Sequence, residues 1–416
     1  MFEKVLCTSF KSNGYGGWSA LSAIVFITVA VILIAFNLYK GQISSLDTAT
    51  YSELADGLLL QHFDWIQFAT SNPRNAAPIY FYGVPITTFA LAKLISITQW
   101  KSIVFGLNLL LIPISLYLVR KILQVCGVSV LLVSASPIMF LFSSDFPLWP
   151  HYILSDTIYV TLLLWVIYLV LRSFAHRDAS SHAVFILAIL LLIFSRPASP
   201  PVIVALLFSY SFPWLFRQTS FTLRLWLIPL LGAIFVFVTI SAVVMLNLDG
   251  GSQITQLNHA RGDTALYHHV ADSVISMLKQ GLVIHDRPET WIDFEGGFIS
   301  VLTILCTRFA YFFAPYVDAF SLMHTLINLS FFLFVGSAIV FGEVCASLVE
   351  AKEKLNQAKG LLVLLIVSVA VFHSVTLIDY DWRYRYPVIA PMIVLAFIEL
   401  NYICLYFSSR KTRLVT

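Results

Sequence analysis

The sequence predicts an all-α polytopic membrane protein, and three observations lead to this fold class. Of the 416 residues, 59% are hydrophobic and 11% are charged, and the mean hydropathy is +0.86. Soluble domains carry about a quarter charged residues. Apolar stretches long enough to cross a bilayer recur from residue 17 to residue 407. The alternating pattern of a membrane barrel is missing, so helices are expected to satisfy the backbone groups in lipid.

We expect about 10–12 transmembrane helices in a single transmembrane domain that covers residues 1–416. The apolar runs lie at residues 19–39, 78–97, 103–119, 128–142, 153–171, 183–194, 202–216, 225–246, 319–346, 360–378 and 388–407. Two polar segments interrupt them. Residues 40–77 are predicted as a first outer loop with an interfacial helix, and residues 247–318 as a large outer loop.

Basic residues orient the chain, because cytoplasmic loops of membrane proteins are enriched in Lys and Arg. Such residues mark the N-terminus at Lys4 and Lys11, the segment 352–359, and the C-terminus at 410–413. These three regions are therefore predicted to be cytoplasmic. The acidic segment 40–77 is predicted to lie on the outer side.

Two apolar runs do not fit this orientation as full crossings. Basic residues at 101 and 120 flank the run 103–119, which is therefore expected to be a hairpin or a partial span. The run 298–316 contains Arg308 and is expected to be an amphipathic helix on the outer surface. About ten crossings then remain. This arrangement gathers several polar segments on one outer face: 40–77, 143–152, 196–201, 247–318 and 379–387.

Two carboxylates are the candidate catalytic groups on that face. Asp47 follows the first span, where it could accept a proton from a hydroxyl group or serve only as a helix N-cap. Asp156 lies about one turn into an apolar run, where an ionisable group is costly and faces a cavity or a partner. A residue favoured at a helix start by the macrodipole is the simpler explanation of Asp156.

Arginines near the same face are the candidate phosphate ligands. They are Arg74, Arg196, Arg383 and Arg385. The planar guanidinium fork matches phosphate oxygens and keeps its charge. Salt bridges to Asp379 or Asp381, or contacts with lipid headgroups, are the alternative roles. Carboxylates and arginines together indicate a polar substrate carried on a lipid phosphate.

The sequence resembles the GT-C class of polyprenyl-phosphate-sugar-dependent glycosyltransferases, which includes protein O-mannosyltransferases and aminoarabinose transferases. The resemblance rests on short motifs in order: Asp47, Tyr51, Leu54 and Ala55 after the first span; Pro73 and Arg74 with residues 78–85; Ser155 and Asp156; Arg196 and Pro197; and RYRYPVIAP at 383–391. Thr48 stands where several subfamilies have a second acidic residue.

This resemblance implies transfer of a sugar from a polyprenyl-phosphate carrier to an acceptor hydroxyl, with inversion, on the non-cytoplasmic side of the cell (inner) membrane. Asp47 would be the base or the orienting carboxylate, Asp156 a second catalytic carboxylate, and Tyr51 and the arginines would bind substrate. The acceptor would be a glycan, a lipid or a protein. No cofactor and no nucleic acid are expected, and a divalent metal stays open.

Two other functions are compatible with the sequence. A transporter or lipid flippase would have broken helices that meet at the middle of the bilayer. An oligosaccharide polymerase or ligase would depend on Arg and His of the large outer loop, such as His259, Arg261, His268, His269 and His285. The sequence contains no HExxH metal motif and no nucleotide-binding loop, which argues against an ATP-driven pump.

Overall fold

The computed structural model describes residues 20–71, 73–143, 145–175, 179–196, 199–211, 297–315, 321–349, 353–375 and 382–415. Within these residues the regular elements are all helices, and the β contact found there is an isolated bridge between Ile43 and Tyr152. The prediction of an all-α membrane protein is confirmed at this level. Most of the outer loop 247–318 lies outside the described residues.

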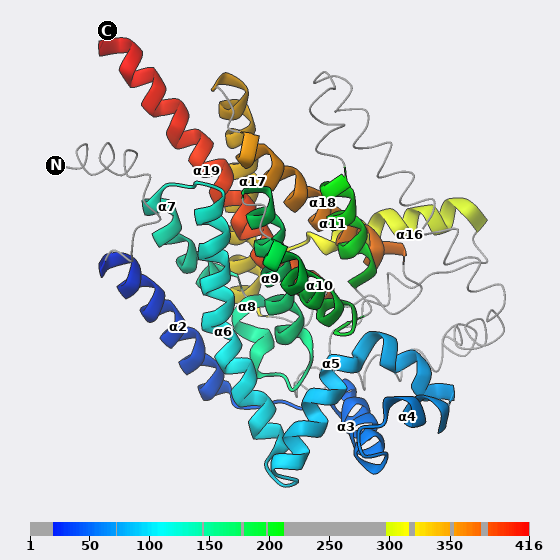
Figure 1. The fold of residues 1–416 in the computed structure, drawn as a ribbon. Coiled ribbons are helices and arrows are strands. Elements are labelled where there is room, and N and C mark those ends of the chain that lie inside the picture. Colours follow the sequence, from blue (N-terminus) through cyan, green and yellow to red (C-terminus); the bar gives the residue numbers. More distant parts are fainter. Residues whose placement is uncertain are drawn as a thin grey trace.

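The helices form one bundle with a group of shorter helices at one end (Figure 1). In chain order they are α2 (Ala20–Lys40), α3 (Leu46–Leu60), α4 (Trp65–Ser71), α5 (Pro73–Ile95), α6 (Trp100–Val125), α7 (Val130–Ala135), η1 (Ser136–Phe142), α8 (Asp145–Leu148), η2 (Trp149–His151), α9 (Asp156–Ala175), α10 (Ala179–Ile193), α11 (Ser199–Ser211), α16 (Gly297–Phe312), α17 (Leu322–Leu348), α18 (Glu353–Val375), η4 (Trp382–Arg385) and α19 (Tyr386–Val415).

Five helices of the described residues are long and apolar enough to cross a membrane: Ala20–Lys40, Trp100–Val125, Leu322–Leu348, Leu355–Ser374 and Arg383–Arg410. A sixth crossing would be the broken pair Val130–Phe142 and Asp145–His151, which is bent by 70°. Two shorter apolar helices, Tyr82–Ile95 and Ala183–Ile193, are also present. An integral membrane protein is thus supported, whereas the count of 10–12 crossings stays a prediction.

The second long crossing is α6, and this corrects the sequence-based assignment. Residues 103–119 were expected to form a hairpin or a partial span, but they lie inside one helix of 26 residues. The run 78–97 was expected to cross, but it belongs to α5, which packs against α3 and α4 at the lower end of the bundle in Figure 1. Lys101 therefore lies at the same end of the bundle as Lys40, and Arg120 and Lys121 lie toward the other end.

The run 298–316 forms α16, whose 16 residues do not qualify as a crossing. Its Arg308 side chain is 1% exposed, so the helix does not turn this charge to water as an amphipathic surface helix would. The helix packs against α18 and η4 instead.

The centre of the bundle is formed by α9 and α19. In the apolar stretch of α19, 78% of the residues are buried inside the protein, against 28% in the peripheral helices α2 and α17. Ser115 of α6 and Thr161 of α9 share a hydrogen bond of 2.8 Å. Gly342 of α17 lies directly against Glu399 of α19, where a Cβ atom would collide. A small residue at a helix contact in lipid lets two backbones approach closely.

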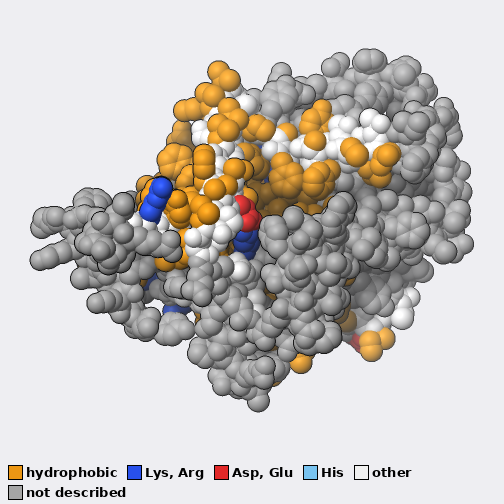
Figure 2. Space-filling model, turned by 90° about the horizontal axis from the view of Figure 1, so that it is seen from above, with side chains coloured by type: hydrophobic (Ala, Val, Ile, Leu, Met, Phe, Trp, Pro, Cys, Tyr) orange, Lys and Arg blue, Asp and Glu red, His pale blue; other side chains and the backbone are white. Residues whose placement is uncertain are grey.

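The outer surface of the bundle is hydrophobic, as expected of helices that face lipid. Figure 2 looks onto the end opposite α3–α5, where hydrophobic side chains dominate the described surface and charged atoms are few. Exposed large side chains follow α2 and α17, among them Ile24, Ile27, Leu333 and Phe341. These helices are therefore the lipid-facing walls of the bundle.

The new assignment of α6 predicts that its two ends lie on opposite sides of the membrane. In a chain whose native cysteines are replaced by serine, Thr98→Cys and Gln124→Cys should react with a membrane-impermeant maleimide from opposite sides. Labelling of both positions from one side of oriented vesicles would support the hairpin and contradict a crossing helix.

Candidate functional site

The start of α3 is hydrogen-bonded to the chain just before α9. The amide of Ile43 donates to the carbonyl of His151 at 2.9 Å, and the amide of Ile153 donates to the carbonyl of Ile43 at 2.9 Å. The Thr48 hydroxyl then donates to the Ile153 carbonyl at 2.8 Å. These contacts bring the first turns of α3 and α9 together although about 105 residues separate them in sequence.

Ser45 is the N-cap of α3, so the interpretation of Asp47 as an N-cap is wrong. The Ser45 hydroxyl accepts from the Thr48 amide at 3.4 Å, and the Thr48 hydroxyl accepts from the Ser45 amide at 2.9 Å. This capping box satisfies two of the amides at the start of the helix. The Asp47 side chain is therefore available for contacts outside its own helix.

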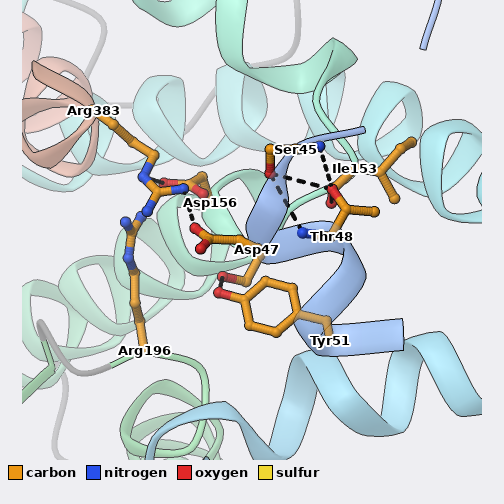
Figure 3. A network of polar contacts seen from close by, with 9 residues as sticks. Ser45, Asp47, Thr48, Tyr51, Ile153, Asp156, Arg196 and Arg383 are labelled. Carbon is orange, nitrogen blue, oxygen red and sulfur yellow. Dashed lines mark hydrogen bonds and ion pairs between the residues drawn. The ribbon is translucent and has the colours of Figure 1, made fainter. Parts of the chain in front are cut away.

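Four charged side chains from four segments meet at this point (Figure 3). They are Asp47 of α3, Asp156 of α9, Arg196 after α10 and Arg383 of η4. The Arg383 Nη1 atom donates to Asp47 Oδ2 at 2.7 Å, and its Nε atom lies 3.9 Å from Asp156 Oδ1. Arg196 Nη1 donates to the same Asp156 oxygen. The structure thus brings together four of the predicted site residues.

Exposure separates the two carboxylates. The Asp47 side chain is 40% exposed, whereas that of Asp156 is 2% exposed and has one oxygen within 3.9 Å of both guanidinium groups. Burial is the largest single influence on the pKa of Arg196 and acts to lower it, but Asp156, Tyr51 and Tyr82 together raise that pKa above its ordinary value. Arg196 therefore stays charged, and Asp156 holds both arginines toward the half-exposed Asp47.

Tyr51 lies one helical turn after Asp47 and faces the same cluster (Figure 3). Its hydroxyl group lies 3.5 Å from the Ser155 Oγ atom, and its ring centre lies 5.2 Å from that of Tyr82. Burial raises the pKa of Tyr51 well above its ordinary value. The phenol therefore keeps its proton and can act here as a neutral hydrogen-bonding group.

An open apolar groove of about 440 Å³ lies between α4, α5 and the end of α10. It is lined by Trp65, Gly83, Val84, Thr87, Thr88, Leu191 and Phe194. Two of the lining residues are close in sequence to residues of the site. Gly83 follows Tyr82, the neighbour of Tyr51, and Phe194 precedes Arg196 by two residues. The amide of Val84 also donates to the Phe194 carbonyl at 2.9 Å, which joins α5 to the end of α10.

Arg385 does not reach the cluster, so the expectation that it binds phosphate there is wrong. Its Nε atom donates to Asp145 Oδ2 at 2.8 Å, and both side chains are 1% exposed. A second nitrogen lies 3.4 Å from the other Asp145 oxygen, a third donates to the carbonyl of Ala314, and the guanidinium carbon lies 5.4 Å from the centre of the Phe332 ring. Arg385 therefore ties η4 to α8 and to the end of α16.

Arg74 is in the first turn of α5, but its side chain lies outside the described residues, as do Asp379 and Asp381. The predicted role of Arg74 and the alternative salt bridges of the arginines stay predictions.

Sequence reasoning missed two side chains that support η4. Asp145 pairs with Arg385, and His373 stacks on Tyr384 with ring centres 4.3 Å apart. His373 is an ionisable residue within the apolar run 360–378, which is the signal that could have found it, whereas Asp145 lies in the polar segment 143–152 and carries no such signal. They contact Tyr384 and Arg385, the two residues that follow Arg383, so the orientation of Arg383 depends on them.

The fold and the site together define a helical membrane protein with a charged cluster at one end of its bundle. In the described part of the chain, no group of three or more His, Cys, Asp or Glu side chains lies close enough to hold a metal ion. Comparisons with protein-family models, with curated proteins and with solved structures found no match for this chain.

The buried pair of Arg385 and Asp145 predicts a large loss of stability when one partner is removed. Arg385→Met should lower the free energy of unfolding by about 3–5 kcal/mol, because it leaves a buried carboxylate unpaired. Replacing both partners, Asp145→Leu with Arg385→Met, should recover most of that loss. Unfolding in detergent micelles, followed by circular dichroism, measures both effects.

The matched control is Glu53→Gln, which removes an exposed carboxylate from α3 and should change stability by no more than about 0.5 kcal/mol. If Arg385→Met is as stable as this control, the pair does not hold η4 in place.

Proposed function

We propose that this protein is an integral-membrane glycosyltransferase that moves a sugar from a polyprenyl-phosphate carrier to an acceptor hydroxyl. The observation that carries the proposal is the meeting of Arg196, Arg383 and the half-exposed Asp47, and an open apolar groove whose lining includes Phe194 adds to it. A lipid-linked sugar phosphate has three parts, which are an anion, an apolar chain and a reacting sugar carbon. The site offers a matching group for each part.

The two arginines would hold the donor phosphate. Their guanidinium groups lie side by side in Figure 3, and they come from separate segments of the chain. A planar fork can give two parallel hydrogen bonds to a phosphate. Because charge develops on the phosphate as the sugar departs, fixed positive groups stabilise the transition state more than the ground state.

Asp47 would be the base that accepts the proton of the acceptor hydroxyl. In a single displacement, the acceptor oxygen forms a bond to the anomeric carbon while the bond from that carbon to the phosphate oxygen breaks. The electron pair of the broken bond stays on the phosphate, and the acceptor proton passes to Asp47. Of the two carboxylates, Asp47 is the one exposed enough to meet an acceptor. Asp156 would position Arg196 and Arg383.

The groove would take the first isoprene units of the carrier. Its lining is mainly apolar, and Thr87 and Thr88 turn their hydroxyl groups to carbonyls of their own helix, at 2.6 and 2.8 Å. Burial of an apolar chain there would stabilise binding by roughly 25 cal/mol per Å² of apolar surface. The proposed position places the phosphate at the mouth of the groove, beside Arg196.

The positive-inside pattern supports a cytoplasmic position for the N-terminus, which would put the cluster on the non-cytoplasmic side of the cell (inner) membrane. A glycan, a lipid or a protein that carries a free hydroxyl there is the proposed acceptor.

A transporter or lipid flippase is the second candidate, and one observation favours it. The broken helices Val130–Phe142 and Asp145–His151 are the kind of element from which transporters build their sites. Glu399 and Lys359, whose charged atoms lie 3.0 Å apart inside the bundle, add a buried ion pair away from the cluster. Sugar transfer by the purified protein separates this candidate from the enzyme, because a transporter forms no new glycosidic bond.

Asp47→Asn should abolish sugar transfer while the fold persists. The amide keeps the shape of the side chain but cannot take the proton, and loss of a general base reduces rates by about 10²–10⁴-fold. Transfer from a panel of undecaprenyl-phosphate-linked hexoses and pentoses to membrane acceptors measures the effect. Near-normal transfer by a folded Asp47→Asn protein would remove Asp47 from the mechanism.

Arg383→Lys and Arg196→Lys should each reduce transfer by about 10²-fold, although both keep the positive charge, because an ammonium group does not reproduce the planar fork. Arg172→Lys, in the last turn of α9 and exposed, is the control that should leave transfer unchanged. Full activity of both site variants would show that no bidentate phosphate contact is made.

A further inference from the structure

The contact between Asp47 and Arg383 sets a condition on how the site can bind a phosphate. Arg383 Nη1 is hydrogen-bonded to Asp47 at 2.7 Å, and Arg196 is hydrogen-bonded to the buried Asp156. Each guanidinium group is therefore already paired with a carboxylate. An incoming phosphate must therefore compete with a carboxylate for Arg383.

Asp47 is the carboxylate that an incoming phosphate can displace from its arginine. Its side chain is 40% exposed, so water can hydrate it when it leaves Arg383. Asp156 is 2% exposed and lies within reach of both arginines, so its release would leave an unpaired charge in the protein interior. The two carboxylates are thus unequal competitors for an incoming phosphate.

The backbone that carries Asp47 is fixed, which confines the change to the side chain. The capping box of Ser45 and Thr48 holds the first turn of α3, and the Thr48 hydroxyl is tied to Ile153. A rotation of the Asp47 side chain is therefore enough to separate it from Arg383, and no helix has to move.

We propose that the donor phosphate replaces Asp47 on Arg383 and that this exchange turns Asp47 into a base. While it is paired with Arg383, Asp47 Oδ2 accepts a hydrogen bond from the guanidinium group and is not open to an acceptor hydroxyl. Once the phosphate takes over the guanidinium group, the carboxylate is released beside the bound sugar. The acceptor oxygen then bonds to the anomeric carbon, its proton passes to Asp47, and the phosphate leaves with the electron pair of the broken bond.

This inference rests on the proposed function, and it adds an order of events. The donor must bind before an acceptor hydroxyl can be activated, because the donor phosphate is what frees the base. Such an order would protect the site from activating water or an acceptor when no donor is bound. It also predicts that loss of Asp47 strengthens donor binding, whereas substitution of a binding-site residue usually weakens it.

The test is the affinity of the full-length protein, reconstituted in lipid nanodiscs, for undecaprenyl phosphate. Asp47→Asn should bind this lipid about tenfold more tightly than the unaltered protein, because a charged competitor for Arg383 is gone. Asp47→Ala is a second variant with the same expected direction. Glu53→Gln removes a negative charge from the exposed face of the same helix and should leave the affinity unchanged.

Arg383→Gln separates failure of this inference from failure of the proposed function. If Arg383→Gln weakens binding but neither Asp47 variant strengthens it, the phosphate binds Arg383 without displacing Asp47, and the exchange is wrong. If Arg383→Gln binds as the unaltered protein does, or if the unaltered protein does not bind the lipid, the phosphate site itself is wrong. If Glu53→Gln tightens binding as much as Asp47→Asn, the effect is a general change of charge and the exchange is again wrong.

Discussion

The site depends on the hydrogen bonds that join the chain before α3 to the chain before α9. The bridge at Ile43 and Tyr152 and the bond from Thr48 to Ile153 fix two helix starts beside each other at one end of the bundle. In lipid a backbone segment without regular structure must find its partners inside the protein. This pairing satisfies two such segments at once, and it sets Asp47 and Asp156 within reach of the same arginines.

Charge pairing then determines the role of each arginine. A charge buried without a partner is expensive in a lipid-immersed bundle. The side chains of residues 382–385 therefore point in different directions. Arg385 pairs with the buried Asp145, and Tyr384 stacks on His373. Arg383 points toward the half-exposed cluster. The inward contacts hold the turn rigidly, and Arg383 is presented in a defined orientation. A preorganised guanidinium group of this kind is what stabilisation of developing charge requires.

The sequence was sufficient for the fold class and for the grouping of Asp47, Asp156, Arg196 and Arg383, because charges in an apolar chain are few and must pair. It could not separate Arg383 from Arg385, since both share one motif and only packing decides which faces Asp145. It also gave residues 103–119 as a hairpin or a partial span, because the flanking basic residues do not show that the helix continues to Val125. The capping role of Ser45 was hidden by the acidic neighbour two residues later.

The central claim is that Arg196 and Arg383 form the phosphate site of a lipid-linked donor. An experimental structure of the protein with undecaprenyl phosphate bound in a nanodisc tests it most directly. The account predicts phosphate density between the two guanidinium groups, with the apolar chain leaving through the groove lined by Trp65 and Phe194. Density for the phosphate at the opposite end of the bundle, or at the ion pair of Lys359 and Glu399, would contradict it.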